Sequence, residues 1–128
     1  MAEGNAPAQD GTAGIRQDPI TDIVRNGSSV IVSLAGELDL YNAHALRETL
    51  IQCCDEAPER LVVDLSEVKF IDSTALGVLI EARTRMPNRR GFLLAAPGLE
   101  TRRALEISGL DRHFAVYDSV EQARSTAL

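Results

Sequence analysis

The chain has 128 residues, of which 45% are hydrophobic and 25% charged, a composition typical of one globular domain. Nineteen acidic and thirteen basic residues give a net charge of −6, which disfavours nucleic-acid binding because a phosphate backbone needs a basic face. No apolar run approaches the roughly 18 residues of a membrane span, so we expect a cytoplasmic protein that binds neither nucleic acid nor membrane.

The first residues differ in composition from the rest. Residues 1–17 are predicted to be a disordered or loosely held tail, because up to Gly14 their only apolar residues are Met, Ala and Pro. Residues 18–128 are predicted to form one domain. It opens with strands over Ile20–Val24 and Ser29–Ala35, joined by a hairpin turn at Asn26-Gly27.

Helices then alternate with strands along the rest of the chain. Asn42 and Ser119 are expected N-caps, Pro58 ends the first helix, and Gly109 follows the third helix at its C′ position. The expected helices cover residues 43–57, 73–86, 97–108 and 120–124, and the expected strands cover 61–65, 92–96 and 113–117. This order predicts an α/β fold with a mixed, mostly parallel sheet of four or five strands and about four helices.

The predicted topology places three strand-to-helix loops at one edge of the sheet, because crossover connections between parallel strands are right-handed. Two of these loops are expected at residues 36–41 and 66–72. We therefore expect Glu37, Asp39, Asp72 and Ser73 on one side of the molecule, at the edge where open α/β sheets usually bind ligands and partners.

Ser73 stands at or beside the start of the most apolar predicted helix. Two roles fit: a plain helix cap, or a phosphorylation site at a helix end whose N–H groups favour an anion. A phosphate adds about 1.5–2 negative charges. Since the helix end accepts such a charge, we expect phosphorylation to change the surface and leave the fold intact.

At these residues the chain is similar to a known family. The residues that carry the similarity are Gly36-Glu37-Leu38-Asp39, Phe70-Ile71-Asp72-Ser73-Thr74-Ala75-Leu76-Gly77-Val78-Leu79, Ile107-Ser108-Gly109-Leu110 and 114–117. From about Ile20 to the C-terminus, the chain resembles the STAS domain of bacterial anti-sigma factor antagonists.

The resemblance implies a non-enzymatic switch in transcription regulation. The unmodified antagonist binds an anti-sigma factor, often a serine kinase, and frees a sigma factor. The kinase phosphorylates a Ser that maps onto Ser73, with Thr74 as the rival acceptor, and a phosphatase resets the protein. The residues expected to contact the partner are Glu37, Asp39, Asp72, Ser73, Thr74 and Leu76. Ala75 replaces a common Gly of the family, and we expect its methyl to lie near the acceptor hydroxyl.

Other functions remain open. The same domain serves as a scaffold or signalling module in stress-response complexes outside direct sigma-factor control. A phospho-receiver is disfavoured because the only Lys, Lys69, comes too early, and a serine hydrolase because no Gly-x-Ser-x-Gly motif is present.

Several polar residues have two possible roles. Asp72 is either a first-turn acid or an aid to phosphoryl transfer at Ser73, and Asp39 is either a loop-capping carboxylate or a partner contact. Asp64 is expected to be a hydrogen-bonded structural acid within its strand.

The remaining candidates indicate no cofactor and no metal. The adjacent Cys53 and Cys54 exclude a disulfide framework, and at least one should face the core. His44 and His113 are expected on the surface. The helix dipole accounts for the basic run that ends the second helix, although a contact with an acidic partner also fits it; the run comprises Arg83, Arg85, Arg89 and Arg90.

Overall fold

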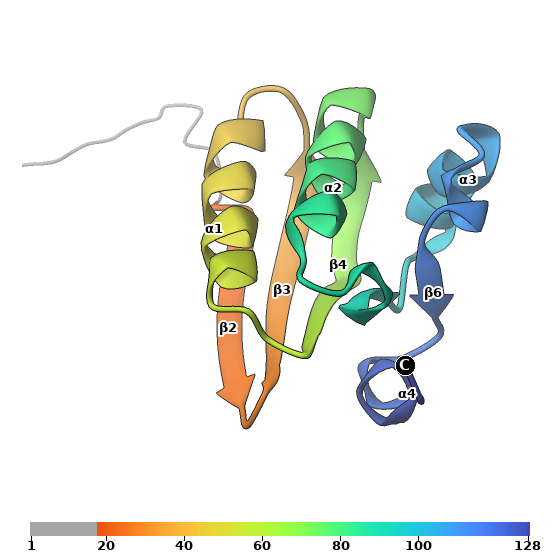
Figure 1. Ribbon diagram of the computed structural model, residues 1–128. Coiled ribbons are helices and arrows are strands. Elements are labelled where there is room, and N and C mark those ends of the chain that lie inside the picture. Colours follow the sequence, from red (N-terminus) through yellow and green to blue (C-terminus); the bar gives the residue numbers. More distant parts are fainter. Residues whose placement is uncertain (1–17) are drawn as a thin grey trace, which may run out of the picture.

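The computed structural model describes residues 18–128 (Figure 1), so the predicted tail lies outside the described residues. Its strands are β2 (Ile20–Asn26), β3 (Ser29–Leu38), β4 (Arg60–Ile71), β5 (Phe92–Ala95) and β6 (Ala115–Tyr117). Its helices are α1 (Ala43–Asp55), α2 (Ser73–Arg85), α3 (Leu99–Ile107) and α4 (Val120–Ser125), with short 3-10 helices at η1 (Arg89–Gly91) and η2 (Leu110–Arg112). The predicted α/β class is confirmed.

The strands form one five-stranded sheet in the order β2-β3-β4-β5-β6. Only β2 is antiparallel to its neighbour, and β3 to β6 run parallel, so the predicted mixed, mostly parallel sheet is confirmed. The hairpin turn lies one residue later than expected. Asn26 still pairs with Ser29 in the ladder, and Gly27 takes the left-handed conformation (φ 62°) that the two-residue turn requires.

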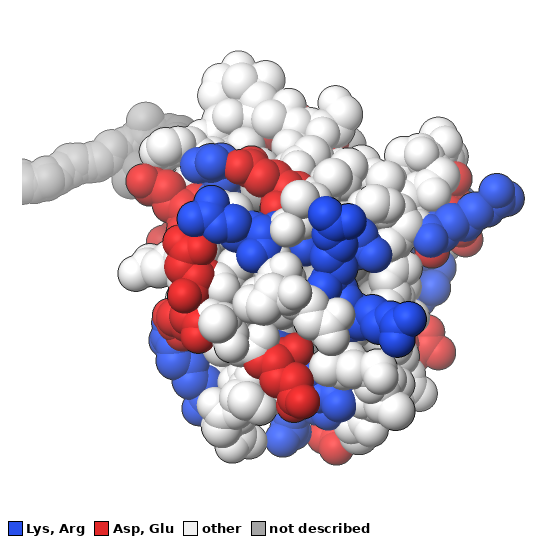
Figure 2. Space-filling model, in the orientation of Figure 1, with Lys and Arg blue, Asp and Glu red and all other residues white. Residues whose placement is uncertain are grey.

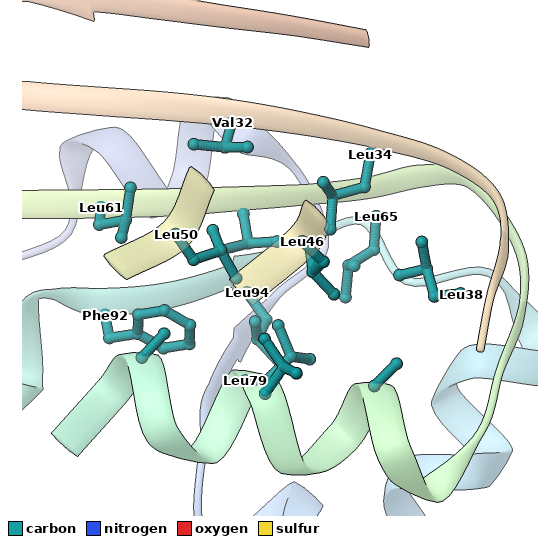
Figure 3. Close-up of a cluster of buried hydrophobic side chains, with 14 of the residues drawn as sticks. Val32, Leu34, Leu38, Leu46, Leu50, Leu61, Leu65, Leu79, Phe92 and Leu94 are labelled. Carbon is teal, nitrogen blue, oxygen red and sulfur yellow. The ribbon is translucent and has the colours of Figure 1, made fainter. Parts of the chain in front are cut away.

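Helices cover the two faces of the sheet unequally. Helices α1 and α2 lie side by side over one face (Figure 1), and the main core joins them and α3 to the inward side chains of β3, β4 and β5. Leu34 and Leu65 of the sheet meet Leu46 of α1 and Leu79 of α2 in this layer (Figure 3), and all four are at most 1% exposed. Helix α4 packs on the other face through Ala123, against Val62 and Leu93.

Strands β3 and β4 are longer than the sequence indicates, so most of the loops expected at 36–41 and 66–72 are strand. The ladder between them continues to the pair Leu38 and Ile71, past a bulge at Gly36 (φ 81°). Apolar burial explains the extension, since Leu38, Val68 and Ile71 are at most 5% exposed. The exposed polar residues between these positions led to the loop prediction.

Several helix ends also differ from expectation: α3 covers Leu99–Ile107 rather than 97–108, and α4 ends at Ser125 rather than at residue 124. Helix α1 stops at Asp55 because Ala57 adopts a left-handed conformation (φ 56°), before Pro58 is reached. Met86 is extended (ψ 141°), as is usual for a residue that precedes Pro, so α2 ends one residue early. The caps predicted at Ser119 and Gly109 are confirmed: Ser119 Oγ accepts from Gln122 N, and Gly109 has φ 78°.

Candidate functional site

The carboxyl ends of β3 and β4 bring together the residues that the sequence singled out. Asp72 N donates to Leu38 O at 3.0 Å, and Leu40 N donates to Asp72 Oδ2 at 3.2 Å. These bonds tie the β3–α1 loop, which contains Asp39, to the start of α2 at Ser73. The prediction that these residues share one side of the molecule is therefore confirmed.

Asp72 holds this edge together with both of its carboxylate oxygens. It is the N-cap of α2, where Oδ1 accepts from Ala75 N at 3.0 Å, while Oδ2 accepts from Leu40 N. An N-cap bond of this kind is worth about 1 kcal/mol. Asp72 therefore precedes the helix rather than lying in its first turn, and its oxygens are both engaged by the backbone.

The β3–α1 loop is braced by its own polar side chains. Asp39 is half-buried and its Oδ1 accepts from Tyr41 N at 3.0 Å, which is the loop-capping role. Asn42 occupies the N-cap position of α1 but makes no capping bond; it accepts from Asp39 N at 2.9 Å and donates to Glu37 O at 2.7 Å. The loop is thus rigid, and the Glu37 side chain is left exposed.

Ser73 and Thr74 are the exposed hydroxyls of this edge. Ser73 is the first residue of α2, and the role of helix cap considered for it belongs to Asp72. Within residues 18–128, neither hydroxyl has a hydrogen-bond partner. Ser73 is therefore accessible, and its hydroxyl is not needed by any contact of the fold.

The next two residues turn inward. Ala75 is 0% exposed and Leu76 is 7% exposed, and both belong to the main core. Ala75 faces the core because a helix turns by about 100° per residue, so its methyl, although only two residues from Ser73, presents no surface that could obstruct a partner. Leu76 therefore offers little surface to a partner and is not expected to contact one.

Large exposed apolar side chains lie at the same edge of the sheet as the two hydroxyls, and the sequence analysis missed them. Leu40, Tyr41, Phe70 and Leu99 are 62%, 74%, 50% and 70% exposed, and they follow or end strands β3, β4 and β5. The uncharged top of the molecule, over the start of α2 and the β3–α1 loop, is white in Figure 2. Exposed apolar residues gathered in this way mark interaction surfaces. The available signal was apolar residues inside segments that otherwise read as polar loops.

Two ion pairs fix α2 against α1. Arg47 donates to Glu81 in a bidentate pair, with a shortest distance of 2.6 Å, and Arg85 donates to Asp55 at 3.0 Å. The hydrogen bond from Arg47 lowers the pKa of the Glu81 carboxyl below its ordinary value. These exposed pairs contribute little energy but set the position of the helix that carries Ser73.

The other candidate residues lie away from this edge. Cys53 and Cys54 are both buried in the core, as expected for at least one, and burial raises the pKa of Cys54 to about 11. Asp64 Oδ1 accepts from Ser66 N at 3.0 Å, which confirms its structural role. His44 is exposed on α1. Among the described residues, no group of three potential ligands could hold a metal ion, and no helix is long and apolar enough to cross a membrane.

Comparison with known proteins identifies the domain. The family model described as STAS domain matches residues 21–123. The chain belongs to the STAS domain family. The resemblance seen in the sequence is thereby confirmed for nearly all of the described domain.

Curated STAS relatives are anti-sigma factor antagonists. The anti-sigma-F factor antagonist RsfB of Mycobacterium tuberculosis is 34% identical over 107 residues, covering 83% of this chain and 88% of the relative. The anti-sigma-B factor antagonist of Bacillus subtilis is 34% identical over 91 residues, covering 70% of this chain and 82% of the relative.

Solved structures agree with this assignment. An anti-sigma factor antagonist from Mycobacterium paratuberculosis superimposes with a TM-score of 0.78 and 32% identity, over 86% of this chain and 95% of that one. Unphosphorylated SpoIIAA, also an anti-sigma factor antagonist, has a TM-score of 0.69 over 84% of this chain and 98% of that one; at 19% identity it shows the shared fold alone.

Proposed function

We propose that this STAS protein is an anti-sigma factor antagonist that binds its anti-sigma factor through the edge around Ser73 and is switched off by phosphorylation of Ser73. The anti-sigma factor is a serine kinase, and a phosphatase restores the unmodified protein. The kinship with curated antagonists supports the kind of partner. The exposed position of the Ser73 hydroxyl supports the switch.

The accessible, unbonded Ser73 hydroxyl on a braced helix end is the observation that carries the proposal. Asp72 accepts hydrogen bonds from Ala75 N in α2 and from Leu40 N in the β3–α1 loop, so the helix start that carries Ser73 is tied to the neighbouring loop. Leu40, Tyr41 and Phe70 supply apolar contact area nearby, and aromatic anchors of this kind dominate binding energy at protein interfaces.

Phosphorylation acts on this surface by charge. The kinase transfers the γ-phosphoryl group of ATP to Ser73 Oγ, ADP leaves, and the hydroxyl proton passes to a base of the kinase. The product carries about 1.5–2 negative charges where the unmodified side chain carries a neutral hydroxyl. Burying that charge against a partner shaped for a hydroxyl carries a large desolvation penalty, so the complex dissociates. The phosphatase then uses water to release inorganic phosphate and return the hydroxyl.

Binding of variants to candidate anti-sigma factors tests the proposal. The Ser73→Ala protein should bind as tightly as wild type and remain unphosphorylated in the presence of kinase and ATP. The Ser73→Asp protein should bind about tenfold more weakly or worse, a difference of about 1.4 kcal/mol. Isothermal titration calorimetry and phosphosite mapping provide the two readouts.

Gln52→Glu is the matched control for charge. Gln52 is exposed on α1, and the change adds one negative charge while keeping the shape of the side chain. This variant should bind like wild type. Equal binding of the Ser73→Ala and Ser73→Asp proteins, or phosphate found at Thr74 instead, contradicts the proposed switch.

A further inference from the structure

A second candidate site lies at the other end of α2, where arginines without acidic partners surround a pocket. The pocket has a volume of about 370 Å³. Four arginines line it: Arg83 from α2, Arg89 and Arg90 from η1, and Arg112 from η2. Figure 2 shows basic side chains gathered over the end of α2 and the turn that follows it.

These four arginines differ from the others in the described chain. Six arginines form ion pairs with carboxylates, namely Arg25, Arg47, Arg85, Arg102, Arg103 and Arg124. Arg60 donates to the backbone oxygen of Ala123. Within residues 18–128, none of the four pocket arginines pairs with a carboxylate, and no acidic side chain lines the pocket. Leu128 at the chain end is part of the wall, and its carboxylate forms no ion pair with these arginines.

The fold does not account for this cluster. The dipole of α2 favours a cation at Arg83, in its last turn, but Arg89, Arg90 and Arg112 lie outside that helix. Four like charges around one hollow repel each other, which costs stability. In a chain with nineteen acidic residues, leaving all four unpaired indicates that an external anion neutralises them.

We propose that this pocket docks a short acidic segment of a protein, whose carboxylates pair with Arg83, Arg89, Arg90 and Arg112. Guanidinium groups bind carboxylates through paired, charge-assisted hydrogen bonds, so the acidic side chains of such a segment complement the positive charge of the cluster. Arg89, Arg90 and Arg112 are exposed, so the rim is open to a peptide.

Other anions fit the pocket less well. The Phe92 and Phe114 rings in its wall are 0% and 4% exposed, so neither presents a free face on which a nucleobase could stack. His113 and Tyr117 also line the pocket and are more accessible, so the oligonucleotide in the test below covers stacking on them. A long polyanion would extend over the rest of a chain whose net charge is −6 and be repelled by it. A short acidic segment meets only the pocket.

The pocket is independent of the Ser73 surface. Arg83 lies ten residues after Ser73 on α2, which is about 15 Å at 1.5 Å per residue. The arginines of η1 and η2 precede β5 and β6, so they lie at the amino ends of parallel strands, whereas Ser73 follows the carboxyl end of β4. Failure of this proposal therefore leaves the proposed function untouched.

Fluorescence anisotropy with a labelled hexaglutamate peptide tests the site. Wild type should bind hexaglutamate and not hexaglutamine, and the affinity should fall as salt is raised, because the contacts are charged. The double substitution Arg89→Ala and Arg90→Ala should weaken binding about tenfold, through the loss of two charge-assisted contacts. Their guanidinium groups form no hydrogen bond or ion pair in the described chain, so the fold should be retained and the melting temperature should not fall.

The control is the double substitution Arg25→Ala and Arg103→Ala. It also removes two positive charges, but from exposed ion pairs on β2 and α3 that lie outside the pocket lining. Binding should change less than about twofold. Equal losses in the two double variants, or no binding of hexaglutamate by wild type, overturn the proposal. So does tight binding of inorganic pyrophosphate or of a single-stranded oligonucleotide in place of the peptide, because the site then takes phosphates.

Discussion

Asp72 and Ser73 are neighbours with opposite importance for the fold, and substitution of each to Ala measures the difference. Asp72→Ala removes the N-cap bond to Ala75 N, worth about 1 kcal/mol, and the bond to Leu40 N, worth about as much. The free energy of unfolding should fall by about 2 kcal/mol. Ser73→Ala removes an exposed hydroxyl without a described partner, so the change should stay within about 0.5 kcal/mol.

Urea unfolding of the two variants, followed by circular dichroism at pH 7, provides the measurement. Asp72→Asn is an informative intermediate, because Asn caps helices as well as Asp but has one acceptor oxygen instead of two. It should lose about 1 kcal/mol. Similar losses for Asp72→Ala and Ser73→Ala would mean that the Ser73 hydroxyl supports the helix, and the reasoning that it is free for modification would be refuted.

Four further predictions concern stability and reactivity. Gly77 lies on the exposed side of α2, and an added Cβ would meet no atom within 4 Å. Gly77→Ala should therefore raise the free energy of unfolding in urea by about 0.5–1 kcal/mol. A decrease would mean that the Cβ meets a neighbouring group after all. The buried Thr101 hydroxyl has no hydrogen-bond partner among the described residues, so Thr101→Val should stabilise the protein by about 1 kcal/mol in thermal unfolding. Destabilisation of that size would show a hidden hydrogen bond. The Arg47 hydrogen bond lowers the pKa of Glu81 in the folded protein below 4.5, so the ion pair contributes fully to stability above pH 4.5 and its contribution is lost as the pH falls through the folded pKa. The difference in unfolding free energy between wild type and Glu81→Gln should therefore vanish in acid. A difference that stays constant with pH argues against the pair. Burial raises the pKa of Cys54 to about 11, so iodoacetamide should label this thiol at least about tenfold more slowly in the native protein than in the urea-unfolded protein. Mass spectrometry measures the two labelling rates, and equal rates contradict the burial.

The parts of the fold that could be predicted from the sequence have strong periodicity. Leu46 and Leu50 of α1, and Leu76 and Leu79 of α2, recur at helical spacing and all are buried. Alternation of such helices with apolar strands predicted the parallel sheet, and the direction of its crossovers placed Asp39 near Ser73 without any contact information.

Other features depend on tertiary contacts that no local pattern carries. The strand character of residues 66–71 comes from pairing with the end of β3. Most of the outward side chains of this segment are polar, which is why it was predicted to be a loop. The capping role passed from Ser73 to Asp72 because the helix starts at Ser73, one residue earlier than a Ser73 cap requires, and both residue types cap well. The inward direction of the Ala75 methyl follows from that same start.

The apolar surface illustrates a further limit. Leu40 and Phe70 fall in segments that the sequence indicates as loops, and only the structure shows that these two apolar side chains face solvent at the edge that carries Ser73. The pocket arginines are similar. The sequence shows a basic run at the end of α2. Only the folded structure shows that Arg112 from η2 joins this run and that the four arginines have no acidic partners among the described residues.

The most direct measurement of the central claim compares the affinity of the anti-sigma factor for the unmodified protein and for the protein that carries phosphoserine at position 73. Calorimetric titration should show a loss of at least about 100-fold, equivalent to about 2.7 kcal/mol, with the circular dichroism spectrum and the unfolding midpoint of the modified protein unchanged. Equal affinity of the two forms contradicts the account, and so does a loss of affinity that accompanies melting of α2.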